Sequence, residues 1–550
     1  MTFPLNTMTL RVLSTLVCTA LVACGGGGSE AVTGTPVASN GTVVAIPAAT
    51  TPEVTTPAVT TPVAATPEAA PPVVTTPDAA TPIGAAPAPT DTGGKADTPT
   101  TVTTPTTGNY LRPYAANSLW NTRPVDPVFG TFVIPKSSYF PTIASGAYST
   151  GVFLASATDQ PMTVIGRTST ATVTTGVADP DAGGSHVVTI PRWPAGVLPA
   201  TGTDGHADIV DPVTGTVHSF WQLKQVNGKW TAALYSWSKL AGTGWGDPAH
   251  YYQGARAVGI PASAGLVRKH EIKDGLPTYK HALAMSLTFN ALANGVDSPA
   301  YVFPATSADG SASANTGAIP QGALLMLPPG FDSSKIVNPD LKKIVETLKL
   351  YGAYIVDRND GTPFVIYVEN DAGFSLMPNG WDNTIASQLD QIRAGLRQVV
   401  SAPAWIDADG NSAVEAIQAQ KNMSILSMRG PWSRQSGTTT AAYDSATQRL
   451  VFDATTTKTV YVNANNTGMT PVKWAVPAAG SYVKFTVSAT GGATLRMQVG
   501  ATGATTIDTG ALADGQSLRF AWPANGRFTL IATSGTSGAS SVQAELVPSP

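Results

Sequence analysis

The chain has 550 residues, of which 12% are charged, and its formal net charge is −3. That length exceeds one ordinary domain, and the charge lacks the basic excess that is typical of nucleic-acid binding. The two cysteines, Cys18 and Cys24, both lie before residue 25, which excludes a disulfide framework or a cysteine zinc site in the folded part.

The first segment has the features of a lipoprotein signal peptide. Arg11 precedes an apolar run over residues 12–22, which is too short to span a bilayer as a helix. The run ends in Leu-Val-Ala before Cys24, and the match resembles the lipobox of bacterial lipoproteins. This resemblance implies that residues 1–23 are removed and that Cys24 is acylated, which anchors a chain to a membrane without spanning it. We expect a lipid-anchored protein of the bacterial cell surface or periplasm, most simply on the outer membrane.

Residues 24–108 are predicted to form a disordered linker. Between residues 31 and 108 the chain holds 14 Pro, 22 Thr and 16 Ala, and no Phe, Trp or Tyr. Such a segment buries too little apolar surface to offset chain entropy, and its Thr-Thr-Pro steps favour an extended spacer. Without signal and linker, residues 109–550 carry 30 basic and 29 acidic side chains, which argues against nucleic acid as a partner.

The folded part is predicted to be mainly β and to form two domains. Over residues 109–430, short β-rich runs between Gly, Pro, Asp and Asn turns indicate an antiparallel domain that resembles a β-sandwich or jelly roll. Apolar residues at helical spacing predict helices over about 338–352 and 384–400. Residues 431–550 predict a second β-sandwich, in the position where accessory carbohydrate-binding domains occur.

Two polar groups are candidates for catalysis. On one strand, His206 and Asp208 would share a face at about 7 Å, and Asp204 precedes them. Further along, Glu271 is followed by His281 at the start of an apolar run, where an imidazole could act as acid, base or ligand. The alternative for each histidine is a structural role at the edge of the core.

Other residues are candidates for binding the substrate. Four of them are polar or aromatic residues close in sequence to the predicted helices or to the catalytic groups: Arg268, Asp357, Trp381 and Asp382. Asp382 also fits a helix N-cap. A Gly-rich loop near residues 242–248 leaves large aromatic residues little core to fill. Exposed aromatic planes suit the C–H faces of sugar rings, so we expect a sugar platform there, with a packed structural loop as the alternative. The loop residues assigned to it are Trp237, Trp245 and Tyr251.

No cofactor is expected. Asp407, Asp409 and Glu415 resemble a calcium loop, but the glycine and the glutamate fall at positions four and nine instead of six and twelve. Calcium therefore stays the weaker alternative.

The order of these motifs resembles a broad family of secreted bacterial proteins to which no activity is attached. The likeness spans about residues 109–400 and rests on Asp-x-His, Arg-x-x-Glu, His-Ala-Leu, Tyr-Gly-Ala-Tyr-x-Val-Asp and Trp-Asp-Asn, in that order. It implies that one domain gathers the following residues around one cleft: Asp204, His206, Arg268, Glu271, His281, Asp357 and Asp382.

These observations favour a surface-anchored enzyme that degrades polysaccharide. A glycoside hydrolase would use two carboxylates among Asp204, Asp208 and Glu271. A polysaccharide lyase would instead use a histidine or tyrosine base with Arg268 neutralising a uronate. A third alternative is a glycan-binding or adhesion lipoprotein without turnover. A peptidase or esterase lacks a recognisable nucleophile motif.

Overall fold

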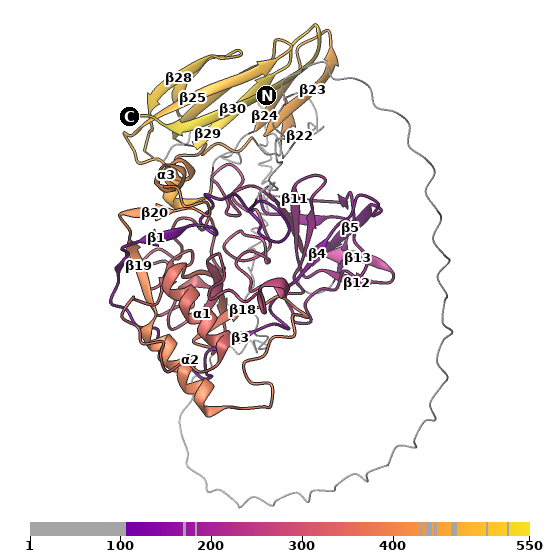
Figure 1. The fold of residues 1–550 in the computed structure, drawn as a ribbon. Helices are drawn as coiled ribbons and strands as arrows, with labels where there is room; N and C mark the ends of the chain where they lie inside the picture. Colours follow the sequence, from indigo (N-terminus) through magenta and orange to yellow (C-terminus); the bar gives the residue numbers. More distant parts are fainter. Residues whose placement is uncertain are drawn as a thin grey trace, which may run out of the picture. The chain divides into compact units, whose positions relative to one another are not determined.

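The computed structural model describes residues 106–168, 172–181, 184–428, 432–435, 443–444, 448–463, 470–501, 504–524 and 527–550. The predicted signal peptide, Cys24 and nearly all of the predicted linker lie outside the described residues. The described part is mainly β, which confirms the predicted fold class (Figure 1). None of its helices is long and apolar enough to cross a membrane.

A seven-stranded mixed sheet forms the centre of the larger β-rich region. Strands β15 and β17 run parallel in its middle, and β18 pairs antiparallel with β15. In spatial order the strands are Val128–Phe129 (β2), Arg397–Ser401 (β19), Leu324–Met326 (β16), Ala353–Asn359 (β17), Leu283–Thr288 (β15), Phe364–Tyr367 (β18) and Thr142–Ala144 (β3).

Two helices cover one face of this sheet. Helix α1 (Pro339–Leu350) is capped by Asn338, whose side chain accepts two backbone N–H groups, and α2 is Asn383–Gly395 (Figure 1). Their apolar sides pack with the inward residues of β15, β17 and β18 in one core. The predicted second helix is too long, because residues 397–401 form β19, whose backbone pairs with β16.

Two smaller sheets lie beside the seven-stranded one. One sheet has six strands and the other has five. One sheet contains Gly151–Leu154 (β4), Ala207–Asp211 (β10), Thr216–Trp221 (β11), Leu234–Lys239 (β14), Val177–Asp179 (β7) and Gly184–His186 (β8). The other contains Lys224–Val226 (β12), Lys229–Ala232 (β13), Met162–Arg167 (β5), Val173–Thr174 (β6) and Val188–Ile190 (β9).

The C-terminal region consists of two five-stranded sheets that share one apolar core. Helix α3 (Val414–Lys421), which the sequence did not predict, precedes this region in the chain. Before α3, strand β20 (Ala404–Ile406) pairs antiparallel with β1 (Arg123–Val125). The first sheet contains Ser433–Arg434 (β21), Val460–Asn463 (β24), Arg527–Thr533 (β29), Thr494–Ala501 (β26) and Ala504–Asp508 (β27). The second contains Tyr443–Asp444 (β22), Arg449–Thr455 (β23), Gly538–Pro548 (β30), Tyr482–Thr490 (β25) and Ser517–Ala521 (β28).

Candidate functional site

Two of the predicted acidic residues gather around a buried arginine that the sequence analysis did not single out. The Nη1 of Arg256 donates to Oδ2 of Asp357 at 2.9 Å, and the Cζ of Arg256 lies 3.9 Å from the ring centre of Tyr367. Asp204 lies near enough for its charge to raise the pKa of Asp357 further. All of these side chains are buried. The structure therefore brings Asp204 and Asp357 into one buried cluster.

His206 belongs to the same buried cluster. Its Nδ1 lies 3.2 Å from the carbonyl oxygen of Phe220 and donates to it, while its Nε2 has no hydrogen-bond partner among the described residues. Burial, and then the charge of Arg256, lower the pKa of His206 to about 4. The imidazole is therefore neutral at pH 7 and has one free acceptor nitrogen.

Asp357 gives the cluster a pH dependence. Burial raises the pKa of Asp357 to about 7, although Arg256 opposes this, whereas an unfolded aspartate titrates near pH 4. Between about pH 4 and pH 7 the folded state keeps a proton that the unfolded state loses, so this group makes the fold less stable as pH rises. We expect the free energy of unfolding of the unsubstituted protein, from urea titrations, to fall relative to that of Asp357→Asn over this interval. Parallel curves would contradict the assignment.

Asp208 holds the backbone together instead of facing solvent. Its carboxylate is fully buried and accepts the Oγ–H of Ser219 and the backbone N–H of Ser263, each at 2.6 Å. Burial raises the pKa of Asp208 in spite of these hydrogen bonds. Asp208 is therefore placed to fix the loop at Ser263 onto β10 and β11, and its predicted role as a catalytic carboxylate in contact with substrate does not fit this position.

Glu271 and His281 form an ion pair. The Nε2 of His281 lies 3.2 Å from Oε2 of Glu271, and its Nδ1 lies 2.8 Å from the carbonyl oxygen of Ala282. Both partners only accept hydrogen bonds, so both ring nitrogens carry hydrogen. Burial opposes this charge, but the carboxylate of Glu271 outweighs it and raises the pKa of His281. His281 is a cation here and has no nitrogen free to act as a base.

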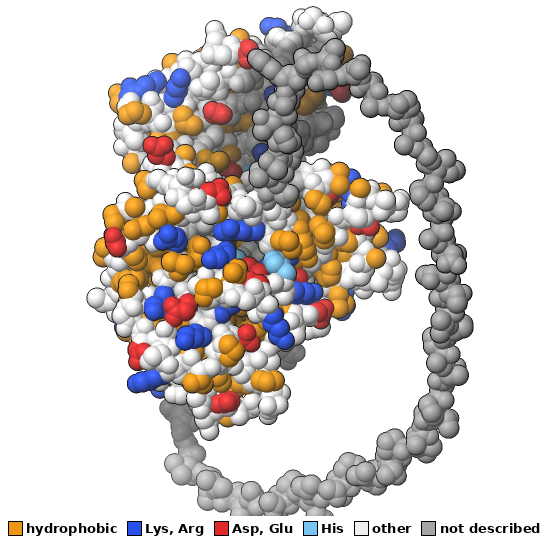
Figure 2. Space-filling view, viewed as in Figure 1, with side chains coloured by type: hydrophobic (Ala, Val, Ile, Leu, Met, Phe, Trp, Pro, Cys, Tyr) orange, Lys and Arg blue, Asp and Glu red, His pale blue; other side chains and the backbone are white. Residues whose placement is uncertain are grey.

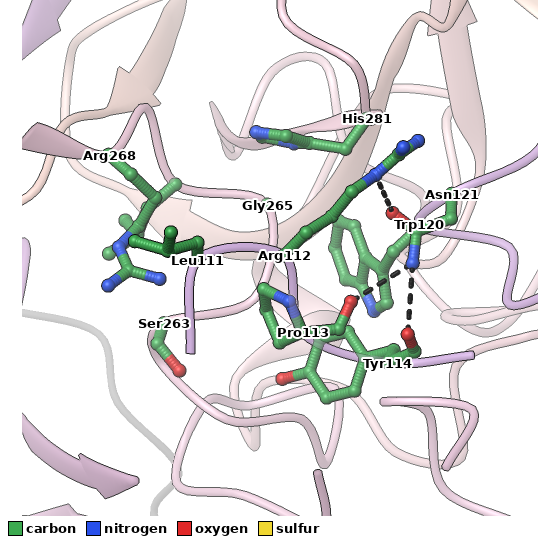
Figure 3. Close-up of a pocket in the computed structure, with 11 residues that line it drawn as sticks. Leu111, Arg112, Pro113, Tyr114, Trp120, Asn121, Ser263, Gly265, Arg268 and His281 are labelled. Carbon is green, nitrogen blue, oxygen red and sulfur yellow. Dashed lines mark hydrogen bonds between the residues drawn. The ribbon is translucent and has the colours of Figure 1, made fainter. Parts of the chain in front are cut away.

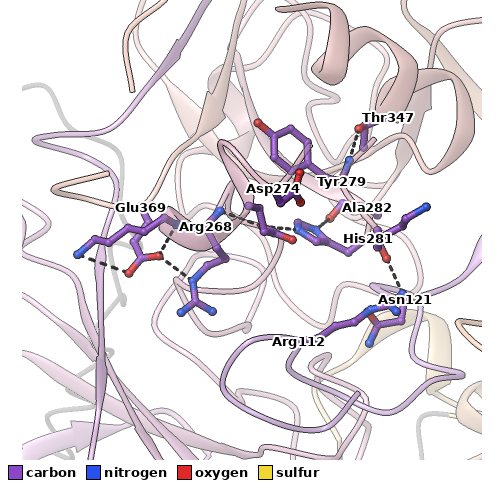
Figure 4. Close-up of polar contacts among 12 residues, drawn as sticks. Arg112, Asn121, Arg268, Asp274, Tyr279, His281, Ala282, Thr347 and Glu369 are labelled. Carbon is purple, nitrogen blue, oxygen red and sulfur yellow. Dashed lines mark hydrogen bonds and ion pairs between the residues drawn. The ribbon is translucent and has the colours of Figure 1, made fainter. Parts of the chain in front are cut away.

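Arg268 lies in a second ion pair of the same region (Figure 4). Its Nε donates to Oε2 of Glu369 at 2.8 Å, and its Nη1 donates to the carbonyl oxygen of Tyr110 at 3.1 Å. The side chain is 4% exposed. Arg268 is thus held by the protein and is not presented to a large ligand.

A small cavity lies between these groups. Figure 3 shows the side chains of His281, Arg268 and Tyr114 around it. Its volume is about 20 Å³, which is room for about one water molecule. Arg268 and His281 line this cavity, and Glu271 contacts both of them, but the space is too small for a sugar. Asp204, His206 and Asp357 form a separate cluster, so the expected single cleft is wrong.

The predicted aromatic platform in the Gly-rich loop is also wrong for Trp245. Trp245 is fully buried and stacks on Trp120, with ring centres 4.7 Å apart and planes 2° from parallel. The glycines of the loop allow close packing, since a Cβ at Gly244 would come within 2.6 Å of the ring of Tyr114. Trp237 and Tyr251 are half-buried. Trp237 packs on a histidine ring, and the hydroxyl of Tyr251 donates to the carbonyl of Pro180.

Exposed aromatic rings occur elsewhere, in a groove of about 550 Å³ between the segment before β3 and the start of α2. We call it the aromatic groove. Tyr139, Phe140 and Trp381 line it and are 66%, 50% and 62% exposed. The described residues of its lining carry no charged side chain; they are residues 138–145, residues 374–377, Trp381 and Leu389.

Local contacts fix the rings of the aromatic groove. Phe140 and Trp381 meet edge to face at 5.2 Å, and Nε1 of Trp381 donates to Oδ1 of Asn383 at 2.8 Å. Oδ1 of Asp382 accepts two backbone N–H groups at the start of α2, so this residue is the helix cap that the sequence offers as its alternative role. Tyr139 lies against Gly361, where a Cβ would come within 3.0 Å of its ring. Trp381 is thus the predicted binding residue that is placed to contact a ligand.

Tyr139 and Phe140 were missed by sequence reasoning. The signal that could have found them is the adjacent pair of aromatic residues before Pro141. Side chains of neighbouring residues in an extended chain point to opposite faces, so two such rings cannot both enter one core. That pair therefore indicates that at least one of the two rings lies at the surface.

Charge is mixed on one face of the molecule. Figure 2 shows basic and acidic side chains interspersed on the face in view.

Among the described residues, no group of three or more His, Cys, Asp or Glu could hold a metal ion. Asp407 of the calcium-like loop instead accepts the backbone N–H groups of Asp409 and Asn411.

No protein-family model and no curated protein matches the chain. Among solved structures, a glycosylation-associated protein complex from Streptococcus agalactiae is similar at 11% identity and a TM-score of 0.15, with 22% of this chain and 45% of that chain covered. A carbohydrate-binding module in complex with β-1,4-galactotriose is similar at 12% identity and a TM-score of 0.15. The match covers 22% of this chain and 90% of that chain. A family 29 carbohydrate-binding module is similar at 8% identity and a TM-score of 0.14. The match covers 23% of this chain and 88% of that chain. At these scores the matches carry no argument about function.

Proposed function

We propose that this protein is a glycan-binding protein of the bacterial surface that holds neutral polysaccharide in the aromatic groove. The observation that carries the proposal is the presence of three exposed rings, Tyr139, Phe140 and Trp381, in one groove with an uncharged lining. Exposed apolar side chains gathered in one place are a common feature of interaction sites on folded proteins. Aromatic planes suit the C–H faces of sugar rings, and the absence of charge favours a neutral sugar.

The rest of the lining suits the same ligand. Ser138, Thr142, Ser145 and Ser375 supply hydroxyl groups beside the rings, and hydroxyls both donate and accept hydrogen bonds. The volume of about 550 Å³ lies within the range of small-ligand sites. The proposed lipid anchor at Cys24 and the linker after it would hold this groove away from the membrane.

A panel of insoluble neutral polysaccharides tests the proposal. The full-length protein in detergent is mixed with each polymer, and bound protein is measured after sedimentation. Retention by at least one neutral polymer, with release by soluble oligosaccharides of the same sugar, is the expected result. Absence of retention by every neutral polymer contradicts it.

Glycoside hydrolysis is the second candidate, and one observation favours it. Asp204 and Asp357 are two neighbouring carboxylates, and the pKa of about 7 at Asp357 suits the acid of such a pair. Both are buried, and the described lining of the aromatic groove contains neither. The loop at Asp204 would therefore have to move to admit a sugar. Mass spectrometry of the same polysaccharide mixtures separates the two functions, because hydrolysis adds one water to each cleaved bond.

Polysaccharide elimination has less support. The base proposed for it at His281 has both ring nitrogens engaged, and Arg268 is paired with Glu369. His206 has an Nε2 without a hydrogen-bond partner in the described part of the chain, but the residue is fully buried.

The linker gives a separate expectation. Deletion of residues 31–108 should leave the affinity for a soluble oligosaccharide unchanged, because the aromatic groove lies outside that segment. Capture of insoluble polysaccharide by whole cells should fall, since a shorter tether brings fewer grooves to the polymer. Titration of the purified protein and a cell-sedimentation assay measure the two effects. An equal loss in both would refute the role as a spacer.

A further inference from the structure

A second hollow, beside β12 and β13, differs from the aromatic groove in its charge. Its volume is about 750 Å³, and we call it the basic groove. One wall is the loop of residues 197–205, and the other is formed by residues 222–225 with Trp230 and Arg167. Arg167 and Lys224 are the charged side chains of its described lining, and no acidic side chain belongs to that lining.

Arg167 has unused hydrogen-bonding capacity at this position. Its Nη1 reaches the carbonyl oxygen of Gln222 only at 3.5 Å, and its buried Nε has no hydrogen-bond partner among the described residues. Neither Arg167 nor the exposed Lys224 forms an ion pair with an acidic residue in the described part of the chain. A buried donor without an acceptor is costly, so an anionic ligand would supply what this site lacks.

Asp204, the carboxylate in the wall segment, does not serve as that acceptor. Asp204 stands between two residues of the groove wall, but its side chain accepts the Nε1–H of Trp221 at 3.2 Å and is 7% exposed. The backbone of this wall is pinned to the opposite wall, because Gln222 N donates to Asp204 O at 2.7 Å. The basic groove is thus a formed feature whose two cations have no acidic partner among the residues that the structure describes.

The remaining lining suits a sugar. Trp230 is half-buried and leans on Trp193, with ring centres 5.0 Å apart, which holds its ring at the groove. Gln222 has a φ of 53°, an uncommon value for a residue other than glycine, and such conformations cluster at functional sites. Its side-chain carbonyl is buried without a partner among the described residues, and so can accept a sugar hydroxyl.

We propose that the basic groove binds a uronic-acid unit of a polysaccharide, with Arg167 and Lys224 on the carboxylate and Trp230 against the sugar ring. A guanidinium matches a carboxylate with two parallel N–H groups, which makes the contact strong and selective. The inference rests on the proposed function in that the ligand is again a glycan. It adds a second site with the opposite charge preference.

A matched pair of ligands tests the proposal. The full-length protein in detergent is titrated by calorimetry with an oligogalacturonate and with its methyl ester, which differ only in the charge of the carboxyl groups. The acid should bind at least about 10-fold more tightly, and the preference should shrink as salt rises, because salt screens charge. Equal affinities for acid and ester, or no binding of either, would overturn the proposal.

Variants locate the preference. Arg167→Gln and Lys224→Gln should each reduce the acid-to-ester preference several-fold. Lys229→Gln makes the same charge change on an exposed residue of the same hairpin that does not line the groove, and it should have no effect. An equal loss in Lys229→Gln would show a general effect of charge and would overturn the proposal. Lys224 is exposed, so its variant stays informative if Arg167→Gln impairs folding.

The two proposals fail in different ways. If binding of neutral polysaccharide depends on Trp381 and the acid and the ester bind with equal affinity, only the uronate site is refuted. The proposed function then stands. Loss of all neutral binding with a clear preference for the acid would remove the aromatic groove as the neutral site and keep the basic groove.

Discussion

Trp381→Ala should raise the dissociation constant for a neutral oligosaccharide at least about 10-fold. An aromatic residue at the centre of an interface contributes about 2 kcal/mol or more, and Trp381 is the largest ring in the aromatic groove. The side chain is 62% exposed, so its loss should change the melting temperature little. Calorimetric titration and thermal unfolding of the same samples measure both quantities.

Two tyrosines provide the matched control for this experiment. Tyr139 and Tyr148 are both exposed, at 66% and 48%, but only Tyr139 lines the aromatic groove. Tyr139→Ala should weaken binding several-fold, and Tyr148→Ala should leave it unchanged. Unchanged affinity in both Trp381→Ala and Tyr139→Ala would refute the groove as the binding site.

Arg256→Met should lower the free energy of unfolding by about 3–5 kcal/mol at pH 8, where its partner is charged. Arg256 and Asp357 are both buried and 2.9 Å apart, and removal of one member of a buried ion pair leaves an uncompensated charge. Asp357 can then avoid the penalty only by taking up a proton. Because removal of Arg256 raises the pKa of Asp357 further, the loss of stability should shrink as pH falls toward 5. Urea denaturation at the two pH values measures this.

A double variant separates the charge from the packing. Arg256→Met with Asp357→Leu removes both charges, and replacement of a buried ion pair by apolar residues is often close to neutral. The double variant should therefore be more stable than Arg256→Met alone. If the two are equally destabilised, the loss reflects packing around Tyr367 and not the missing counter-charge.

Local patterns in the sequence predicted much of the fold. Helix α1 begins where Asn338 and Pro339 predict it, because the cap and the first helical turn are made within a few residues. The end of α2 was misplaced because it depends on a distant partner. Gln398 pairs with Leu325, so β19 begins where the sequence pattern would continue the helix.

The candidate site was harder to predict, because its side chains meet only through the tertiary structure. Arg256 is a single arginine in a segment rich in Gly and Ala, and nothing local shows that it reaches Asp357, about 100 residues later in the chain. Trp245 was assigned to the surface because its loop is rich in glycine. Those glycines instead allow the loop to pack against Tyr114, while Trp245 stacks on Trp120.

The central claim is that neutral glycan binds in the aromatic groove, and hydrogen–deuterium exchange on the full-length protein tests it most directly. Exchange is compared with and without a saturating soluble oligosaccharide. This oligosaccharide is made of the same sugar as the insoluble neutral polysaccharide that retains the protein. We expect protection in peptides covering residues 138–145 and 374–381, with unchanged exchange in peptides from β23 to β30. Protection confined to other segments, with these two unchanged, would contradict the proposed site.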